Sequence, residues 1–158
     1  VGEGTTFSIY LARLTDEEAA EADSETETEE AEVTDLTGTA QIMLVEDEDA
    51  VRTFSTRALT NKGYQVLEAD SGESALKVIE ENADKPLDLL ITDVIMPNMD
   101  GPTLVKKVRE TTPKLKIIFI SGYTEDKLKD HMGDNIYFLP KPFTLKQLAS
   151  KVKEVLDE

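Results

Sequence analysis

The sequence predicts a doubly wound α/β fold for residues 40–158, with a parallel five-stranded sheet covered by helices on both faces. Short apolar runs alternate with segments of helical periodicity from Gln41 onward, a pattern typical of parallel strands joined by right-handed helical crossovers. The first run, 42–45, contains no polar residue, as expected for a strand that is buried on both faces. The 119 residues of this region are enough for one domain.

The strands are predicted where apolar runs are bounded by turn-forming or charged residues. They fall at residues 42–45, 64–69, 87–92, 116–121 and 136–139.

The helices are predicted between and after these strands, at about residues 50–61, 72–81, 102–111, 125–131 and 144–156. In the first helix, four apolar residues recur near helical spacing: Val51, Phe54, Ala58 and Leu59. Gly63 ends that helix, and Ser71 is the expected N-cap of the next one. The last helix carries an apolar stripe formed by Leu145, Leu148, Ala149, Val152 and Leu156.

Two shorter segments precede this region. In residues 1–14, Phe7, Ile9 and Leu11 alternate with other residues, which predicts one strand and which we interpret as the cut edge of a preceding domain. Residues 15–39 contain eleven Asp and Glu but no Lys or Arg. Such a segment repels itself and has little apolar surface to bury, so we expect an extended, disordered linker.

The composition excludes several classes of function. The formal net charge is −16, but residues 40–158 carry 21 acidic against 16 basic residues, so most of the excess lies in the linker. Without a basic surface, direct binding of nucleic acid is not expected. The chain has no cysteine, which excludes disulfides and thiolate metal sites. The apolar runs are too short to span a bilayer, so we expect no membrane contact by this segment.

Acidic side chains follow two of the predicted strands. Glu46 and Asp47 come directly after the first strand, and Asp93 comes directly after the third. In α/β folds of this kind, sites lie beyond the carboxyl ends of the strands. Crowded carboxylates repel one another unless a cation lies among them, and a site that offers only oxygen ligands favours Mg²⁺.

Two further residues reach the same edge of the sheet. Ser121 ends the fourth strand, and Lys141 follows the fifth between two prolines. A divalent cation, a lysine, a hydroxyl and a free carboxylate together form a phosphoryl-transfer site, in which the carboxylate of Asp93 attacks phosphorus.

Four motifs in this region match one family in order and spacing: 44–48 (LVEDE), 93–101 (DVIMPNMDG), 120–123 (ISGY) and 139–143 (LPKPF). The region resembles a response-regulator receiver domain of CheY-like fold. The resemblance implies the strand order 2-1-3-4-5 and a phosphoryl group accepted by Asp93 from a phosphohistidine. It implies that Asp47, Asp93 and the backbone carbonyl of Val94 bind Mg²⁺, with Glu46 acting through water.

The same resemblance assigns roles to the remaining residues. Ser121 and Lys141 would contact the phosphoryl group, and the Lys141–Pro142 peptide bond should be cis. Phe138 stands where the family usually has a tyrosine that fills the space vacated by Ser121, so a switching role for Phe138 competes with a plain core role. Ile95 and Tyr123 occupy positions that tune phosphate lifetime, and both lack an amide or acid to orient water. We therefore expect slow-to-moderate hydrolysis.

Residues 2–11 (GEGTTFSIYL) are similar to the last glycine box and final strand of a histidine-kinase ATPase domain. The motifs of the larger region are most like those of the alphaproteobacterial cell-cycle hybrid kinases. The expected partners are the dimerisation and phosphotransfer domain of the same kinase and a ChpT-like histidine phosphotransferase. The segment itself has no ATP site, and we expect it in the cytoplasm, with the parent kinase anchored in the inner membrane.

Three alternatives stay open at this stage. The first is a binding-only receiver acting through the surface of helix 125–131, strand 136–139 and the last helix, and the second is a stand-alone response regulator. The third is an Asp-nucleophile phosphatase, which usually needs a second Asp where this chain has Ile95.

Overall fold

The computed structural model describes residues 36–122 and 134–158. The predicted strand in 1–14, most of the predicted linker and the predicted helix at 125–131 lie outside these ranges. The sheet has five parallel strands in the order β2-β1-β3-β4-β5, which confirms the predicted fold and strand order. The strands are β1 (Gln41–Val45), β2 (Gln65–Ala69), β3 (Leu89–Asp93), β4 (Lys116–Ser121) and β5 (Ile136–Pro140).

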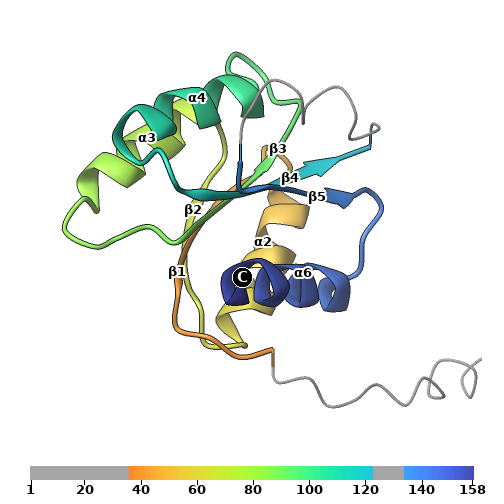
Figure 1. The fold of residues 1–158 in the computed structure, drawn as a ribbon. Coiled ribbons are helices and arrows are strands. Elements are labelled where there is room, and N and C mark those ends of the chain that lie inside the picture. The colour runs from red at the N-terminus through yellow and green to blue at the C-terminus, as the bar shows by residue number, and fades with distance from the viewer. Residues whose placement is uncertain (1–35, 123–133) are drawn as a thin grey trace, which may run out of the picture. The chain divides into compact units, whose positions relative to one another are not determined.

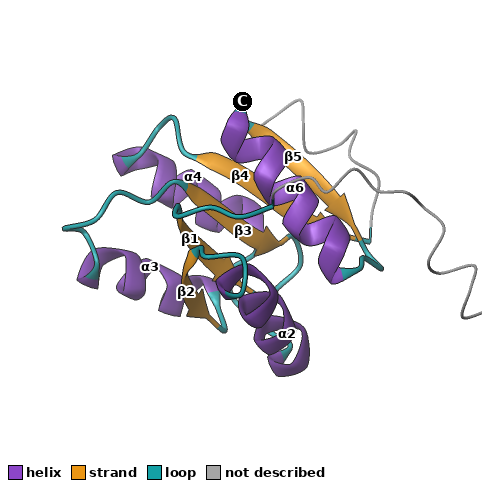
Figure 2. Ribbon diagram, turned by 90° about the horizontal axis from the view of Figure 1, so that it is seen from below, coloured by secondary structure: helices purple, strands orange, loops and turns teal. Residues whose placement is uncertain are grey.

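Helices cover both faces of the sheet (Figures 1 and 2). The helices α3 (Gly72–Glu81) and α4 (Gly101–Thr111) lie on one face, and α2 (Asp49–Thr60) and α6 (Leu145–Asp157) lie on the other. Strand β1 divides its side chains between two cores, since Met43 and Val45 pack under α3 and α4 while Ile42 and Leu44 pack under α2 and α6. Burial on both faces explains why this strand has no polar residue.

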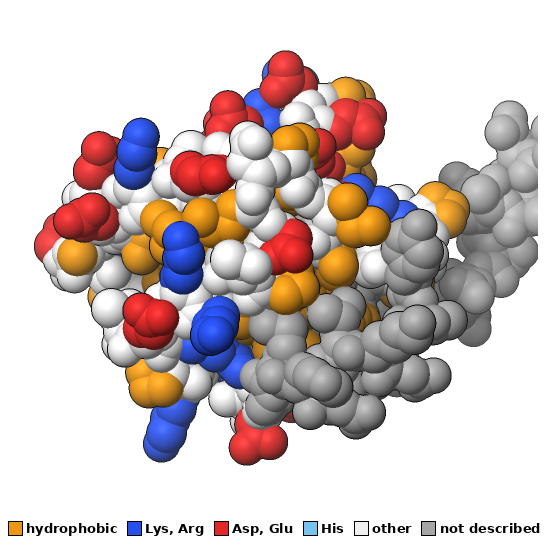
Figure 3. Space-filling model, turned by 90° about the horizontal axis from the view of Figure 1, so that it is seen from above, with side chains coloured by type: hydrophobic (Ala, Val, Ile, Leu, Met, Phe, Trp, Pro, Cys, Tyr) orange, Lys and Arg blue, Asp and Glu red, His pale blue; other side chains and the backbone are white. Residues whose placement is uncertain are grey.

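On the outer side of α3 and α4, acidic and basic side chains are interspersed around a small group of hydrophobic ones (Figure 3).

Within the described residues, no helix combines the length and the apolar character needed to cross a bilayer.

Side-chain caps start α3, α4 and α6 at the carboxyl edge of the sheet, whereas the N-cap of α2, Glu48, makes no such hydrogen bond. Ser71 is the N-cap of α3, as predicted, and it forms a capping box with Ser74. Thr144 forms the same box with Gln147 at the start of α6. At the start of α4, the carboxylate of Asp100 accepts the Thr103 N–H at 2.9 Å. Each cap satisfies N–H groups that the helix leaves without partners.

Two residues predicted on buried helix faces are exposed. Phe54 is 59% exposed and Leu145 is 44% exposed. Successive helix residues are rotated by about 100°, so Phe54 lies beside the line of buried residues in α2, which runs through Ser55 and Leu59. Leu145 is the first residue of α6, whose buried residues begin at Leu148. Phe54 and Leu145 instead line one shared pocket.

Residues just before the predicted start of the domain at residue 40 already contact it. The Gly38 N–H donates to the Lys62 carbonyl at 3.0 Å, and a Cβ atom at Gly38 would overlap the ring of Tyr64. The packed region therefore includes the last residues assigned to the linker.

Gly101 holds the loop between β3 and α4 against the end of β3. Its N–H donates to the carbonyl of Val94 at 3.0 Å, and a Cβ atom there would overlap the carbonyl oxygen of Asp93. We expect Gly101→Ala to lower the free energy of unfolding by about 2 kcal/mol, as overpacking does. This cost exceeds the roughly 0.5–1 kcal/mol that alanine gains over glycine within a helix. Urea unfolding measures the difference.

Gly122→Ala is the matched control, because a Cβ atom at Gly122 would meet no atom of the described residues within 4 Å. Equal stabilities for the two variants would contradict the proposed close approach at Gly101.

Candidate metal centre at the carboxyl edge of the sheet

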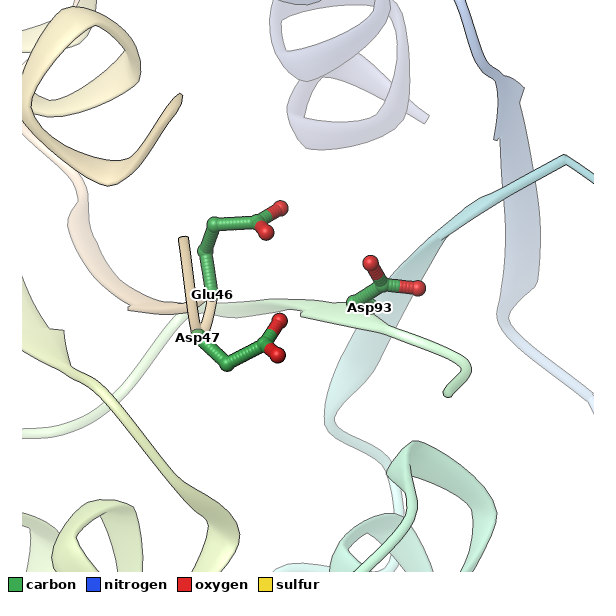
Figure 4. A group of neighbouring side chains, drawn as sticks. All are labelled: Glu46, Asp47 and Asp93. Carbon is green, nitrogen blue, oxygen red and sulfur yellow. The ribbon is translucent and has the colours of Figure 1, made fainter. Parts of the chain in front are cut away.

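The three predicted acids meet at the ends of two neighbouring strands. Strands β1 and β3 pair in register, with Val45 opposite Thr92. Glu46 therefore leaves β1 beside Asp93, which the structure makes the last residue of β3 rather than the first residue after it. Glu46, Asp47 and Asp93 each offer a carboxylate oxygen, and these oxygens lie within 4.8 Å of one another (Figure 4). This all-oxygen set fits a hard divalent cation such as Mg²⁺.

Glu46 is the most deeply buried member of the group, with a side chain that is 1% exposed. One carboxylate oxygen accepts the Glu48 N–H at 3.3 Å, and the other accepts from the Lys141 Nζ at 3.2 Å. Burial raises the pKa of Glu46 above its ordinary value of 4.5, and the charge of Lys141 opposes that shift. The site therefore favours a nearby positive charge, since a buried carboxylate is costly without one.

Lys141 supplies that charge to two of the three acids. Its Nζ lies 2.6 Å from Asp93 Oδ2 as well as 3.2 Å from Glu46. Burial lowers the pKa of Lys141, but its hydrogen bonds and charge interactions with Asp93 and Glu46 outweigh this and leave the pKa raised. The lysine is thus held in its charged form. The Lys141–Pro142 peptide bond is cis, as the family resemblance implied.

The turn after β3 contributes one backbone hydrogen bond to the Asp93 side chain. The Ile95 N–H donates to Asp93 Oδ1 at 3.2 Å, and the Ile95 side chain is exposed. The carbonyl of Val94, predicted as a metal ligand, accepts the Gly101 N–H. That hydrogen bond leaves it fewer lone pairs for a metal.

Ser121 and Phe138 lie on the two strands beyond Asp93. Asp93 is opposite Ile120, so Ser121 is the next residue along β4, and it is buried. Phe138 is also buried, and its ring stacks on Phe119 with centroids 5.8 Å apart. Tyr137, one residue earlier in β5, packs with the cluster on the opposite face of the sheet. Tyr123 lies outside the described residues, so its lifetime-tuning role stays a prediction.

A pocket of about 640 Å³ adjoins Lys141, between the first turns of α2 and α6. Its apolar lining consists of Val51, Phe54, Pro142, Phe143 and Leu145. The exposed apolar residues Phe54 and Leu145 thus border the cluster of charged groups.

Sequence reasoning missed one residue at this edge, Arg52. Its NH1 group donates to the backbone carbonyl of Glu46 at 2.7 Å, and its NH2 group contacts the carboxylate of Asp49. An arginine three residues after an aspartate is a common helical pair. The contact with a main-chain carbonyl left no signal in the sequence.

Comparison with known proteins places this site in a family. The family model described as "Response regulator receiver domain" matches residues 42–153. The chain belongs to the response-regulator receiver family. Within this family, the chain is 36% identical over 118 residues to the response regulator receiver protein CpdR of Brucella abortus, covering 73% of this chain and 96% of that protein.

A longer receiver-containing relative matches the whole chain. The chain is 49% identical over 164 aligned positions to the sensor kinase CckA of Brucella abortus, which covers 100% of this chain but 17% of the kinase. The chain thus spans less than a fifth of that relative. This similarity confirms the predicted likeness to the alphaproteobacterial cell-cycle kinases.

Solved receiver structures show the same fold. The crystal structure of the receiver domain from the hybrid histidine kinase CckA has a TM-score of 0.65 and 50% identity, covering 74% of this chain and 99% of that one. The Vibrio cholerae chemotaxis protein CheY4 has a TM-score of 0.67 and 28% identity, with 75% and 99% covered. Residues 42–153 therefore form a receiver domain of a two-component system.

Proposed function

We propose that this receiver is the phosphoacceptor of a phosphorelay, with Asp93 taking a phosphoryl group from a phosphohistidine and passing it to or from a histidine phosphotransferase. One observation carries the proposal. The carboxylate of Asp93 lies among two other carboxylates and within 2.6 Å of the Lys141 ammonium group. A carboxylate beside a fixed cation is the arrangement that phosphoryl transfer to oxygen needs.

The transfer step balances without any further reactant. A carboxylate oxygen of Asp93 forms a bond to phosphorus while the bond between phosphorus and the donor's imidazole nitrogen breaks. The electron pair of the broken bond stays on that nitrogen, and solvent supplies any proton it takes up. Lys141 and Ser121 contact phosphoryl oxygens, and Lys141 offsets their charge in the transition state. Bound Mg²⁺ supplies further neutralisation of the phosphoryl oxygens.

The carboxylates of Glu46, Asp47 and Asp93 hold the metal in this proposal, with Glu46 acting through water. A backbone carbonyl of the turn after β3 would complete the set of metal ligands. The Val94 carbonyl already accepts the Gly101 N–H. Ile95 lies next along the turn and donates its own N–H to Asp93 Oδ1, so its carbonyl is the alternative ligand.

The similarity to CckA supports a place within a hybrid kinase. In this proposal, residues 1–14 are the end of a kinase ATPase domain, and residues 15–39 are a linker. The phosphohistidine donor is the dimerisation and phosphotransfer domain of the same protein, in a kinase anchored at the inner membrane. The receiver then works in the cytoplasm with a ChpT-like phosphotransferase as its second partner.

The pocket beside Lys141 supports docking of such a partner. A phosphohistidine must approach Asp93 closely, so the partner has to cover the surface next to it. Exposed Phe54 and Leu145 provide apolar anchors there, and aromatic anchors commonly dominate binding energy at interfaces.

We therefore expect Phe54→Ser to slow phosphoryl transfer from a phosphorylated histidine phosphotransferase by at least about tenfold, the loss that corresponds to one anchor. Labelling by acetyl phosphate with Mg²⁺ should be unchanged, because that donor needs no docking surface. Lys107→Ser, on the opposite face, is the control and should leave both rates unchanged. Equal transfer rates for wild type and Phe54→Ser would place docking elsewhere, and failure of labelling by both donors in wild type would favour a binding-only receiver.

A further inference from the structure

Arg52 joins the two ends of the loop that carries the metal-site acids. Its NH1 group donates to the carbonyl of Glu46 at 2.7 Å, where β1 ends. Its NH2 group contacts the carboxylate of Asp49, where α2 begins. The Arg52 side chain is 17% exposed, so most of it is buried rather than solvated.

The helical pair with Asp49 accounts for only one of the two side-chain contacts of Arg52. Arg52 lies in the first turn of α2, where the partial positive charge of the helix N-terminus disfavours a cation. The hydrogen bond to the Glu46 carbonyl lies outside the helix and adds nothing to its own bonding. The pair with Asp49 lies within α2, whereas the contact with the Glu46 carbonyl serves the loop.

The Glu46 carbonyl belongs to the peptide unit that connects Glu46 to Asp47. Because this unit is planar, fixing the direction of its oxygen also fixes the backbone from which the Asp47 side chain leaves. A guanidinium group makes two hydrogen bonds in a rigid fork. It can therefore hold the carbonyl and the Asp49 carboxylate in one relative position.

We infer that Arg52 is a positioning residue for the divalent-cation site, holding the Glu46–Asp47 peptide so that both acids face Asp93. The inference rests on the metal site of the proposed function. Arg52 has two effects of opposite sign on metal affinity. Its charge repels a cation, whereas its hydrogen bonds preorganise the ligands. Positioning predicts weaker metal binding when Arg52 is removed, and charge alone predicts tighter binding.

Calorimetric titration of the full chain with MgCl₂ separates the two effects. We expect Arg52→Ala to raise the Mg²⁺ dissociation constant roughly tenfold, as the loss of groups that orient metal ligands does, with no change in melting temperature of the metal-free protein. Arg52→Lys keeps the charge but not the fork, so it should recover only part of the affinity. Arg57→Ala, an exposed arginine on the same helix, is the control and should match wild type.

An unchanged or lower dissociation constant in Arg52→Ala would overturn the inference, and so would full recovery in Arg52→Lys. If Arg52→Ala does not fold, Asp49→Asn is the second variant, because it keeps Arg52 but removes the carboxylate that its guanidinium group contacts. That variant should bind Mg²⁺ more weakly than Glu48→Gln, which removes an equal exposed charge, and equal affinities would overturn the inference. Wild type without specific Mg²⁺ binding would instead refute the proposed metal site itself.

Discussion

Replacing Asp93 by Asn is expected to abolish phosphorylation of the domain by acetyl phosphate and by any phosphohistidine donor. The amide cannot form the acyl phosphate, and no neighbouring acid is placed to substitute. The Glu46 side chain is only 1% exposed, against 13% for Asp93, and Asp47 does not have the 2.6 Å lysine contact that Asp93 has. Intact-mass spectrometry after incubation with acetyl phosphate and Mg²⁺ measures the bound phosphoryl group.

Asp84→Asn, in an exposed loop, is the charge-matched control and should be labelled as wild type is. Labelling of the Asp93→Asn variant at the wild-type rate would show that another residue is the acceptor.

Lys141→Ala is expected to slow phosphorylation by about a hundredfold at saturating Mg²⁺, the scale set by loss of one preorganised group that stabilises transition-state charge. The Lys141 ammonium group contacts both Glu46 and Asp93. It is therefore placed to contact the oxygens of a phosphoryl group that is transferred to Asp93. Its removal also frees two carboxylates from a competing cation. The Mg²⁺ dissociation constant should therefore stay the same or fall while the rate drops.

Rates measured over a range of acetyl phosphate and Mg²⁺ concentrations separate these effects. Lys151→Ala, on α6 and paired with Glu154, is the control for loss of a lysine. Recovery of the wild-type rate at high Mg²⁺ would mean that Lys141 acts only through the metal.

The sequence was sufficient to predict which acids meet, because the topology of a parallel sheet determines where strand ends lie. Once the family resemblance implied that strands 42–45 and 87–92 are neighbours, Glu46 and Asp93 were expected to emerge side by side. The same reasoning brought Lys141 to this edge. It could not predict that Lys141 contacts Glu46 as well as Asp93, since that depends on the course of the β5–α6 loop.

The sequence was insufficient where burial depends on how a helix is rotated against the sheet, or where a side chain contacts the backbone. Phe54 was grouped with Val51, Ala58 and Leu59 because their spacing suits one helix face, but the buried residues of α2 are Ser55 and Leu59. Arg52 was missed because its main partner is a carbonyl oxygen, and every residue has one. Backbone acceptors cannot be recognised from the sequence of side chains.

The most direct test of the proposed function is to locate the phosphoryl group by chemistry. Borohydride reduction of the phosphorylated domain converts an aspartyl phosphate into homoserine, which peptide mass mapping can place in the sequence. After incubation with a phosphorylated histidine phosphotransferase and Mg²⁺, we predict homoserine at residue 93 and aspartate at residue 47. Homoserine at another position, or a phosphoryl group that borohydride does not remove, would contradict the assignment of Asp93 as the phosphoacceptor.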